Sequence, residues 1–386
     1  MAALKTFTEH TPSMSWSHIT STAELSTLMA ELRREPVLAI DTEASSFHHY
    51  HERICLIQLS TRTATWLVDP LTVTDMTPLV EALADPAIEW VIHDADFDLR
   101  MLKKMWNARV TRVFDTFVAA ELLNEPELGL AALLGKYFGL KVDKRFQKAD
   151  WGKRPLSAEM LAYAAMDTTY LIALRDILSN GLEAKGRTEW AAEEFAHLVH
   201  IPFETPENDE PGFLRMKGAK ALKPRQLAVL RALHAWREPL AEKLDRAPFM
   251  VLGNDVLLEL SRNPPTSLDD FASRKGVGAT VVQRNGREIM RAVEEAMALP
   301  KEAWPRVPRP KRWERDDDYE DRLKRLKQVR DQLMAQYELR PGVVSPNHVL
   351  GEIARTLPGD LDALGKLNGM RPWQVRVFGE ALLKAL

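Results

Sequence analysis

The sequence has almost no cysteine and no long apolar stretch. Its single cysteine, Cys55, cannot form an internal disulfide, which excludes the disulfide-rich secreted scaffolds. No apolar run approaches the roughly 20 residues that span a bilayer, and no basic segment followed by an apolar stretch resembles a signal peptide. Cys55 lies in the apolar run RICLIQLS and is expected to be a small core residue. We therefore expect a cytoplasmic globular protein that does not enter a membrane.

The charge is divided unevenly along the 386 residues. Residues 1–210 contain 20 Lys and Arg against 32 Asp and Glu, a net of −12, whereas residues 211–386 contain 32 against 23, a net of +9. An acidic half can bind metal ions and a basic half can bind a polyanion. Solvated charged faces would produce the same totals, so charge alone leaves both interpretations open.

Short β-rich runs in the first part of the chain alternate with helical patterns. Strands are predicted at PVLAIDTE, RICLIQLS, ATWLVDP, IEWVIHD and RVFDT, and helices at TPLVEALA, DFDLRMLKKMW and TFVAAELL. From about residue 115 to 197 the pattern is almost entirely helical, and Ser157 is predicted to cap a long helix. Strands that first meander and then alternate with helices predict an α/β domain with a mixed sheet flanked by helices.

Two proline-rich segments divide the rest of the chain. Residues 201–216 contain three prolines and a cluster of acids, and residues 299–318 are rich in proline and charge. The helical regions that follow them resemble each other, because each opens with a basic amphipathic helix and ends with a late helix after a proline-bearing turn. We predict three domains, at residues 1–210, 211–298 and 315–386, of which the last two are small and all-α.

Acidic residues stand where a predicted strand ends and on a later helix. Asp41 and Glu43 are two apart on a strand and point to the same face. Their repulsion is relieved by a divalent cation, and oxygen ligands suit magnesium or manganese. Tyr163 and Asp167 are four apart and share a helix face. Each pattern taken alone is common, and a solvated acidic strand end is the ordinary alternative for the first.

A further acidic group falls where a strand gives way to a helix. Asp98 follows His93 by five residues and is expected inside the first helical turn, where it can face the acids of the strand end. Asp94 and Asp96 stand beside it, and both are predicted mainly to favour the helix N-terminus through its dipole.

The order of these groups is similar to that of the DEDD exonucleases. D-x-E at the first strand end, H-x-x-x-x-D at a later strand-to-helix junction and Y-x-x-x-D on a late helix match the three motifs, and the tyrosine marks the DEDDy branch. The stretch from DWGKRPLS to YAAMDTTYL strongly resembles the ribonuclease D family, as do AIDTE, IQL and VDPL. The two C-terminal helical regions look like HRDC domains, so the resemblance covers the whole chain.

The resemblance implies a ribonuclease-H-like fold and a 3′→5′ exoribonuclease that releases nucleoside monophosphates and trims structured RNA precursors, tRNA among them. It implies two divalent ions, Mg²⁺ or Mn²⁺, whose ligands would be Asp41, Glu43, Asp98 and Asp167. Asp41 is expected to bridge both ions, and Tyr163 to orient the attacking water, since a phenol with a pKa near 10 is a poor base at neutral pH. Asp96 is the alternative to Asp98, because Phe97 stands where relatives often have an acid.

Other residues are predicted to support the site or to hold RNA. His93 is expected to be structural, and Asp115 to be a helix cap or support. Positive charge and an aromatic residue before the catalytic helix suit a single-stranded 3′ end. The predicted RNA-binding residues are Lys144, Arg145, Lys148, Trp151 and Arg154. Burial of Trp151 in the core is the alternative. Basic stretches at 217–225 and 311–327 are predicted to contact RNA phosphates.

Two other functions remain open on sequence grounds. A DNA 3′→5′ exonuclease would use the same acids, since none of them contacts a 2′-hydroxyl by necessity. A non-catalytic RNA-binding scaffold would not need all four acids and the tyrosine. No oligomerisation signal is evident, and a monomer is expected.

Overall fold

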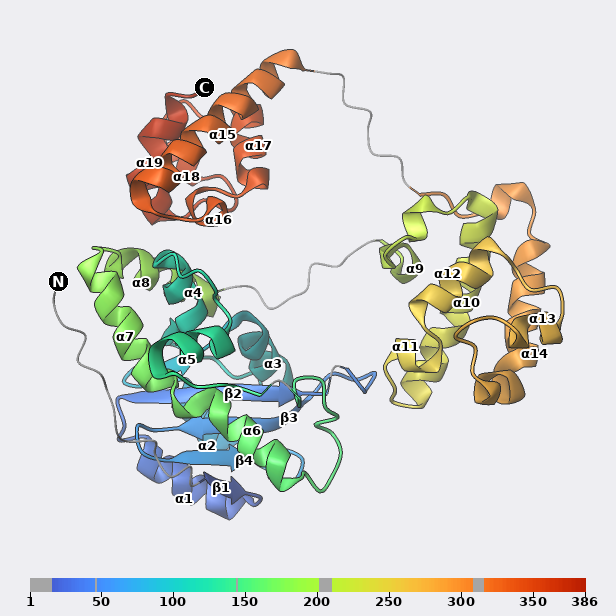
Figure 1. Ribbon diagram of the computed structural model, residues 1–386, viewed down its shortest axis with the longest axis horizontal. Helices are drawn as coiled ribbons and strands as arrows, with labels where there is room; N and C mark the ends of the chain where they lie inside the picture. Colours follow the sequence, from blue (N-terminus) through green and yellow to red (C-terminus); the bar gives the residue numbers. More distant parts are fainter. Residues whose placement is uncertain (1–15, 46, 144, 201–209, 308–315) are drawn as a thin grey trace. The chain divides into compact units, whose positions relative to one another are not determined.

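The computed structural model describes residues 16–45, 47–143, 145–200, 210–307 and 316–386 (Figure 1). Its packing divides the chain into two compact units. The first contains residues 1–43, 54–203 and 313–386, and the second contains residues 44–53 and 204–312. Among the described residues, no helix is both long and apolar enough to cross a bilayer.

A six-stranded mixed sheet forms the centre of the first unit. In spatial order its strands are β1 (Trp16–Ile19), β4 (Thr65–Val68), β3 (Ile54–Ser60), β2 (Val37–Ala44), β5 (Glu89–Ile92) and β6 (Val113–Asp115). β1 runs parallel to β4, β3 antiparallel to β4, and β2, β5 and β6 are mutually parallel along their pairings. The predicted mixed sheet is confirmed, and β1 at its edge was not predicted because its four residues have no distinctive pattern.

Helices cover both faces of this sheet because the strands present apolar side chains to each side. Leu38 and Ile40 of β2 pack in one core with α1 (Thr22–Leu32), α2 (Thr77–Leu83) and α3 (Asp96–Trp106). Ala39, between them, belongs to the opposite core with α4 (Thr116–Leu122), α5 (Leu130–Phe138), α7 (Leu171–Ala184) and α8 (Thr188–His200). Helix α6 (Ala158–Thr169) lies across β3 and β4 (Figure 1). Alternation along β2 thus sends successive residues to different helical layers.

A helical module at the end of the chain completes the first unit. It consists of α15 (Asp317–Tyr337), α16 (Pro341–Val344), α17 (Asn347–Thr356), α18 (Leu361–Gly365) and α19 (Pro372–Leu383). Its Trp373 stacks on Trp190 of α8 with ring centroids 4.6 Å apart, and the indole N–H donates to Glu194. Buried Arg187 donates to the backbone oxygens of Leu122 and Tyr337. The module therefore shares a continuous core with the sheet domain.

The second unit contains another helical module, whose last five α-helices follow the same order as the five α-helices of the first. It contains α9 (Gly212–Arg215), η1 (Ala219–Ala221), α10 (Pro224–Lys243), α11 (Pro248–Val251), α12 (Asn254–Arg262), α13 (Leu268–Ala272), α14 (Ala279–Met297) and η2 (Lys301–Ala303).

The predicted internal repeat is visible at glycines of the two modules. Gly276 and Gly369 have φ of 86° and 93°, and a Cβ at either would lie 2.8 Å from a valine methyl group. Gly286 and Gly379 likewise approach Leu268 and Leu361, with the same offset along the chain. The two modules therefore use glycine for the same turn and the same close helix contact.

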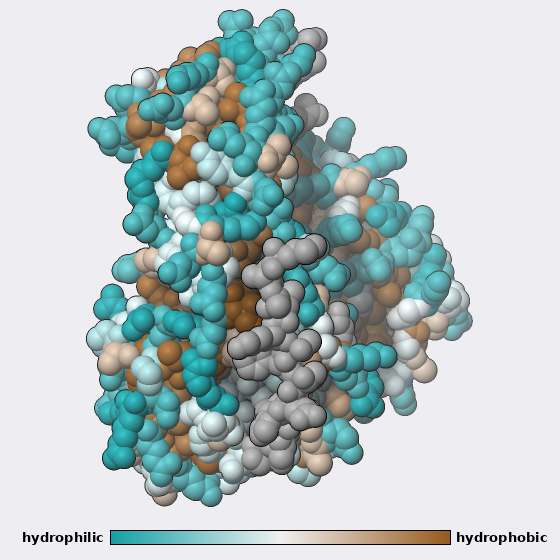
Figure 2. All heavy atoms as spheres, turned by 60° about the vertical axis from the view of Figure 1, so that its left-hand side comes forward, coloured by the Kyte–Doolittle hydropathy of each residue, from teal (hydrophilic) through white to brown (hydrophobic). Residues whose placement is uncertain are grey.

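The surface is mainly hydrophilic where it can be seen, with apolar side chains scattered among polar ones (Figure 2). Within the described parts of the chain, the large apolar side chains that are exposed are Phe47, Leu71, Phe97, Leu244, Phe249, Met250, Leu268, Leu357 and Leu361.

Candidate active site

Three carboxylates from β2 and α6 converge at the end of the central strand. Asp41 and Glu43 lie on the β2 face that α6 covers, because they alternate with Thr42. Asp167, near the C-terminal end of α6, approaches them, and ligand atoms of the three residues all lie within 4.8 Å of one another. Two elements far apart in sequence therefore build one oxygen-rich group.

Asp98 reaches the same region from the other face of the sheet. It lies in the first turn of α3 and is only 6% exposed. Thr42, which points to the α3 side of β2, donates its hydroxyl hydrogen to the Asp98 carboxylate. Asp98 is not one of the three convergent ligands, yet its charge reaches Asp41 and Glu43.

Asp96, the alternative to Asp98, is directed elsewhere. Its carboxylate pairs with Arg100 one turn along α3 and is 40% exposed. Asp94 has a left-handed backbone, with φ of 61°, in the turn before the helix. The geometry of α3 therefore favours Asp98 as the acid of this element.

The acid cluster resists ionisation in the absence of a cation. Burial, and then the charge of Asp167, raises the pKa of Asp41 well above its usual value. Burial and the charges of Asp41, Asp167 and Asp98 do the same to the pKa of Glu43. Burial and the Asp41 charge raise the pKa of Asp98, and burial raises the pKa of Asp167 to about 7. Carboxylates that repel at this spacing are suited to a divalent cation, and all the donors are hard oxygen atoms.

Tyr163 lies one helical turn before Asp167 on α6. Burial, followed by the charges of Asp167, Glu43 and Asp41, raises the pKa of its phenol. The side chain is partly exposed, and its ring lies 6.2 Å from that of Trp151 and 5.8 Å from that of Phe146. At neutral pH the phenol is therefore protonated and can donate or accept a hydrogen bond, but it cannot act as a strong base.

His93 and Asp115 hold the turn that leads into α3. The Asp115 carboxylate accepts hydrogen bonds from the backbone N–H groups of Asp94, Ala95, Phe117 and Val118. It thus caps α4 and ties the start of α3 to it. Nδ1 of His93 lies 2.9 Å from the Thr116 hydroxyl, and burial lowers the pKa of His93 to about 4. Neither residue belongs to the convergent ligand group.

A buried network of hydroxyl groups fixes the C-terminal end of α6. The Ser60 hydroxyl lies 2.7 Å from that of Thr168 and 2.8 Å from that of Thr65. Thr65 also contacts Thr169 at 3.2 Å. Thr168 and Thr169 directly follow Asp167, so these contacts link the Asp167 end of α6 to β3 and β4. The sequence analysis missed them, because isolated serines and threonines have no distinctive spacing.

The predicted RNA-binding residues divide into exposed and buried members. Arg145 and Lys148 are exposed, and Lys144 lies outside the described residues. Trp151 is only 1% exposed and packs in the core with Cys55 and Leu161, so the prediction that it stacks on RNA is wrong for this packing. Arg154 is also mainly engaged within the protein, where it contacts Asp69 and three backbone oxygens.

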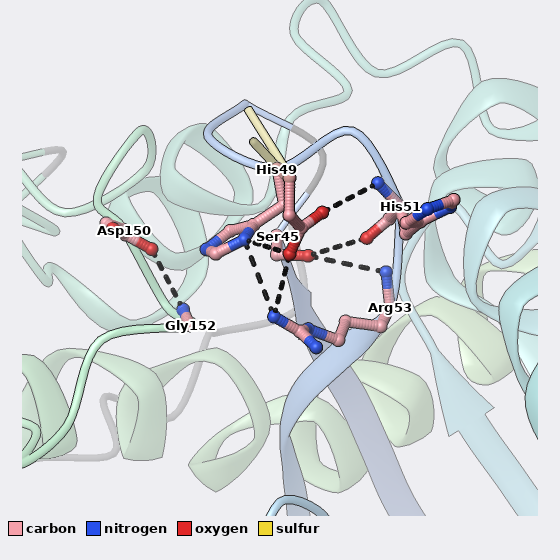
Figure 3. Close-up of polar contacts among 7 residues, drawn as sticks. Ser45, His49, His51, Arg53, Asp150 and Gly152 are labelled. Carbon is pink, nitrogen blue, oxygen red and sulfur yellow. Dashed lines mark hydrogen bonds and ion pairs between the residues drawn. The ribbon is translucent and has the colours of Figure 1, made fainter. Parts of the chain in front are cut away.

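The loop that follows Glu43 belongs to the second unit. Within it, the backbone N–H of Ser45 donates to the Arg53 carbonyl, and Arg53 turns back to lie 3.4 Å from Nδ1 of His49 (Figure 3). Asp245, after α10, contacts His49 at 2.9 Å and Arg53 at 3.3 Å and accepts from the backbone N–H of His51. The loop connecting β2 to β3 is thus folded against the first helical module. Nothing in the sequence pattern indicated this pairing.

Comparison with known proteins agrees with this geometry. A model of 3′→5′ exonucleases matches residues 17–183, and a model of the HRDC domain matches residues 226–293 and 320–386. Ribonuclease D of Gluconacetobacter diazotrophicus is 32% identical over 368 residues, which cover 95% of this chain and 91% of that protein. Ribonuclease D of Escherichia coli is 30% identical over 293 residues, which cover 76% and 78% of the two chains.

Solved structures show the same relationship over nearly the whole length. A protein from Bifidobacterium adolescentis has a TM-score of 0.83 with 25% identity and covers 96% of both chains. The structure of E. coli RNase D, an exoribonuclease involved in structured RNA processing, has a TM-score of 0.69 with 26% identity and covers 97% of this chain and 99% of that one. With its exonuclease domain, its acid cluster and two HRDC domains, the chain belongs to the ribonuclease D family of 3′→5′ exoribonucleases.

Proposed function

We propose that this exoribonuclease releases nucleoside monophosphates from RNA 3′ ends with two divalent ions held by Asp41, Glu43, Asp98 and Asp167. The convergence of Asp41, Glu43 and Asp167 within 4.8 Å is the observation on which the proposal rests. When bound, such ions supply positive charge that activates water and stabilises the leaving 3′ oxygen. Asp98 supplies a carboxylate on the far side of Asp41, which suits a second ion.

Asp41 is the proposed shared ligand of the two ions. It interacts electrostatically with Asp167 on the α6 side and with Asp98 on the α3 side. A residue on a central strand of the sheet is also held more rigidly than a loop residue. Asp41 is therefore placed to contribute to both halves of the site.

Tyr163 is proposed to orient the attacking water by a hydrogen bond. Its raised phenol pKa keeps it protonated at neutral pH, so it positions the water and does not remove its proton. Its place one turn before Asp167 brings it beside the ligand group.

The proposed ions are Mg²⁺ or Mn²⁺, because both prefer carboxylate oxygen ligands. The proposed substrates are structured RNAs with a single-stranded 3′ end, tRNA precursors among them, and the protein is proposed to act as a monomer. This substrate class is supported by the related E. coli enzyme and by the net charge of +9 over residues 211–386, which suits binding to phosphates.

The test uses an RNA that is labelled at its 3′ nucleotide. Wild-type protein with Mg²⁺ or Mn²⁺ is expected to release labelled mononucleotide, whereas Asp41→Asn or added EDTA abolishes release. A matched DNA oligonucleotide, digested in parallel, measures the preference for RNA. Unchanged digestion in EDTA would show that the carboxylates do not act through metal ions.

A further inference from the structure

Arg154 occupies an unusual place in the segment that precedes α6. Its Nε and Nη2 donate to the two carboxylate oxygens of Asp69 at 2.7 and 2.8 Å. Nη2 also donates to the backbone oxygen of Cys55 at 2.7 Å, and Nη1 donates to those of Trp151 and Lys153 at 2.7 and 2.9 Å. One guanidinium therefore joins the segment to a sheet strand and to a buried carboxylate, and it also bridges two backbone carbonyls within the segment.

Asp69 is a firm anchor for this guanidinium. It directly follows β4 and is only 2% exposed, and its backbone N–H donates to Ile19 of the neighbouring strand β1. Its Oδ1 also accepts from the backbone N–H of Leu71 at 2.9 Å. The acceptor of the Arg154 fork is thus fixed by the sheet edge, and a bidentate pair of this kind defines an orientation as well as a distance.

The segment that Arg154 fastens lies against Tyr163. Trp151 is buried between β3 and α6, and its ring lies 6.2 Å from the Tyr163 ring at an angle of 31°. Phe146 meets the same ring edge-on at 5.8 Å. Since the guanidinium of Arg154 is engaged in these hydrogen bonds within the protein and binds the Trp151 carbonyl directly, its position determines where Trp151 lies beside the phenol.

We propose that the Arg154–Asp69 pair positions Tyr163 for catalysis by fixing the position of Trp151, whose ring packs beside that of Tyr163. Arg154 would thus act through Tyr163 and not by binding RNA. The inference rests on the proposed role of Tyr163. A lysine cannot replace this arginine, because a single ammonium group cannot present a planar fork to Asp69 while reaching the carbonyls of Cys55 and Trp151. Displacement of the Tyr163 phenol is expected to lower kcat, since misplacement of a positioning group by about 1 Å can slow a reaction about 100-fold.

The decisive experiment is a double-mutant cycle on the intact protein. Arg154→Lys is expected to lower kcat about 10- to 100-fold while KM stays within about threefold. In a Tyr163→Phe background the same change is expected to cost less than about threefold, because the group that it displaces is already missing. Independent losses that multiply, or a rise in KM at constant kcat, would overturn the proposal.

The control is another bidentate arginine–aspartate pair of the same unit. Arg62 contacts Asp176 at 2.6 and 3.3 Å, and neither residue contacts Tyr163 or Trp151 in the described structure. Arg62→Lys is therefore expected to leave kcat and KM unchanged. If Arg62→Lys lowered kcat as much as Arg154→Lys, the effect would be one of general destabilisation, and the positioning role would be refuted.

Hydrogen–deuterium exchange, which does not depend on nuclease activity, separates this inference from the proposed metal mechanism. In Arg154→Lys, backbone amides of residues 145–157 are expected to exchange with deuterium faster, while those of β2 and β3 exchange as in the wild type. If Arg154→Lys does not fold, Asp69→Asn and Trp151→Phe replace it in the same cycle and exchange measurement. Digestion that persists in EDTA would contradict the metal mechanism alone. Unchanged exchange in residues 145–157 of Arg154→Lys would contradict the positioning role of the Arg154–Asp69 pair.

Discussion

Adding Mn²⁺ to the metal-free protein at pH 6 is expected to release protons from the acid cluster. The ligand atoms of Asp41, Glu43 and Asp167 lie within 4.8 Å of one another. Two full charges at that distance repel by about 3 kcal/mol at an effective dielectric constant of about 20. All three carboxylates therefore do not ionise together unless a cation is present.

The number of protons released is most easily estimated for Asp167. With a pKa of about 7, it is about nine-tenths protonated at pH 6 and about one-tenth protonated at pH 8. Its contribution to proton release on metal binding thus falls from about 0.9 to about 0.1 between these pH values. Asp41 and Glu43, whose pKa values burial also raises, release further protons.

The same shift makes stability depend on pH in the metal-free protein. Because the Asp167 pKa is raised from 3.8 to about 7 on folding, its stabilising contribution is complete below about pH 4 and is lost as pH rises through 7. The metal reverses this loss. At a fixed metal concentration, the increase in Tm on adding metal is therefore expected to grow from pH 5 to pH 8, and to be about 3 °C where the metal is at about 100 times its Kd.

Calorimetric titration in two buffers of different ionisation enthalpy measures the released protons, and thermal unfolding measures the Tm. Asp41→Asn removes a ligand and is expected to weaken binding in both assays. Mn²⁺ binding that has the same affinity and no proton release at pH 6 and pH 8 would refute the reasoning.

The remaining predictions concern single side chains. Tyr163→Phe is expected to lower kcat about 100-fold without changing the Kd for RNA, since it removes only the group that orients water; equal losses in both would make Tyr163 a binding residue. Asp115→Ala leaves four backbone N–H groups without their acceptor. It should reduce the free energy of unfolding by about 3 kcal/mol or more in urea titrations, and a change below about 1 kcal/mol would contradict the capping role. Trp373→Ala removes the stack on Trp190 and the hydrogen bond to Glu194. It should cost about 3–5 kcal/mol, measured by the same titration, and an unchanged midpoint would show that the interface contributes little.

The acids of the site could be predicted because their positions depend on local periodicity. Asp41 and Glu43 share a face in any strand, and Tyr163 and Asp167 share a face in any helix. The cap at Ser157 is local as well, and its hydroxyl accepts from the backbone N–H of Met160 as expected. The mixed sheet followed from the order of strand and helix patterns, and the two C-terminal modules from their repeated composition.

The placement of Trp151 and Arg154 could not be predicted in the same way. A positive charge and an aromatic residue before a catalytic helix suit RNA equally well, and only packing against β3 and β4 shows that both turn inward. The link between Thr42 and Asp98 depends on which face of β2 meets α3, and that choice is made by the sheet as a whole.

The sequence by itself thus determined the chemistry of this member of the ribonuclease D family: which residue types stand at strand ends and helix turns, and in what order. The tertiary structure decided which of them meet. Contacts such as Asp69 with Arg154, or Ser60 with Thr168, join residues far apart in the chain. Backbone propensity and side-chain periodicity act over a few residues, whereas these contacts depend on burial and on the pairing of whole elements.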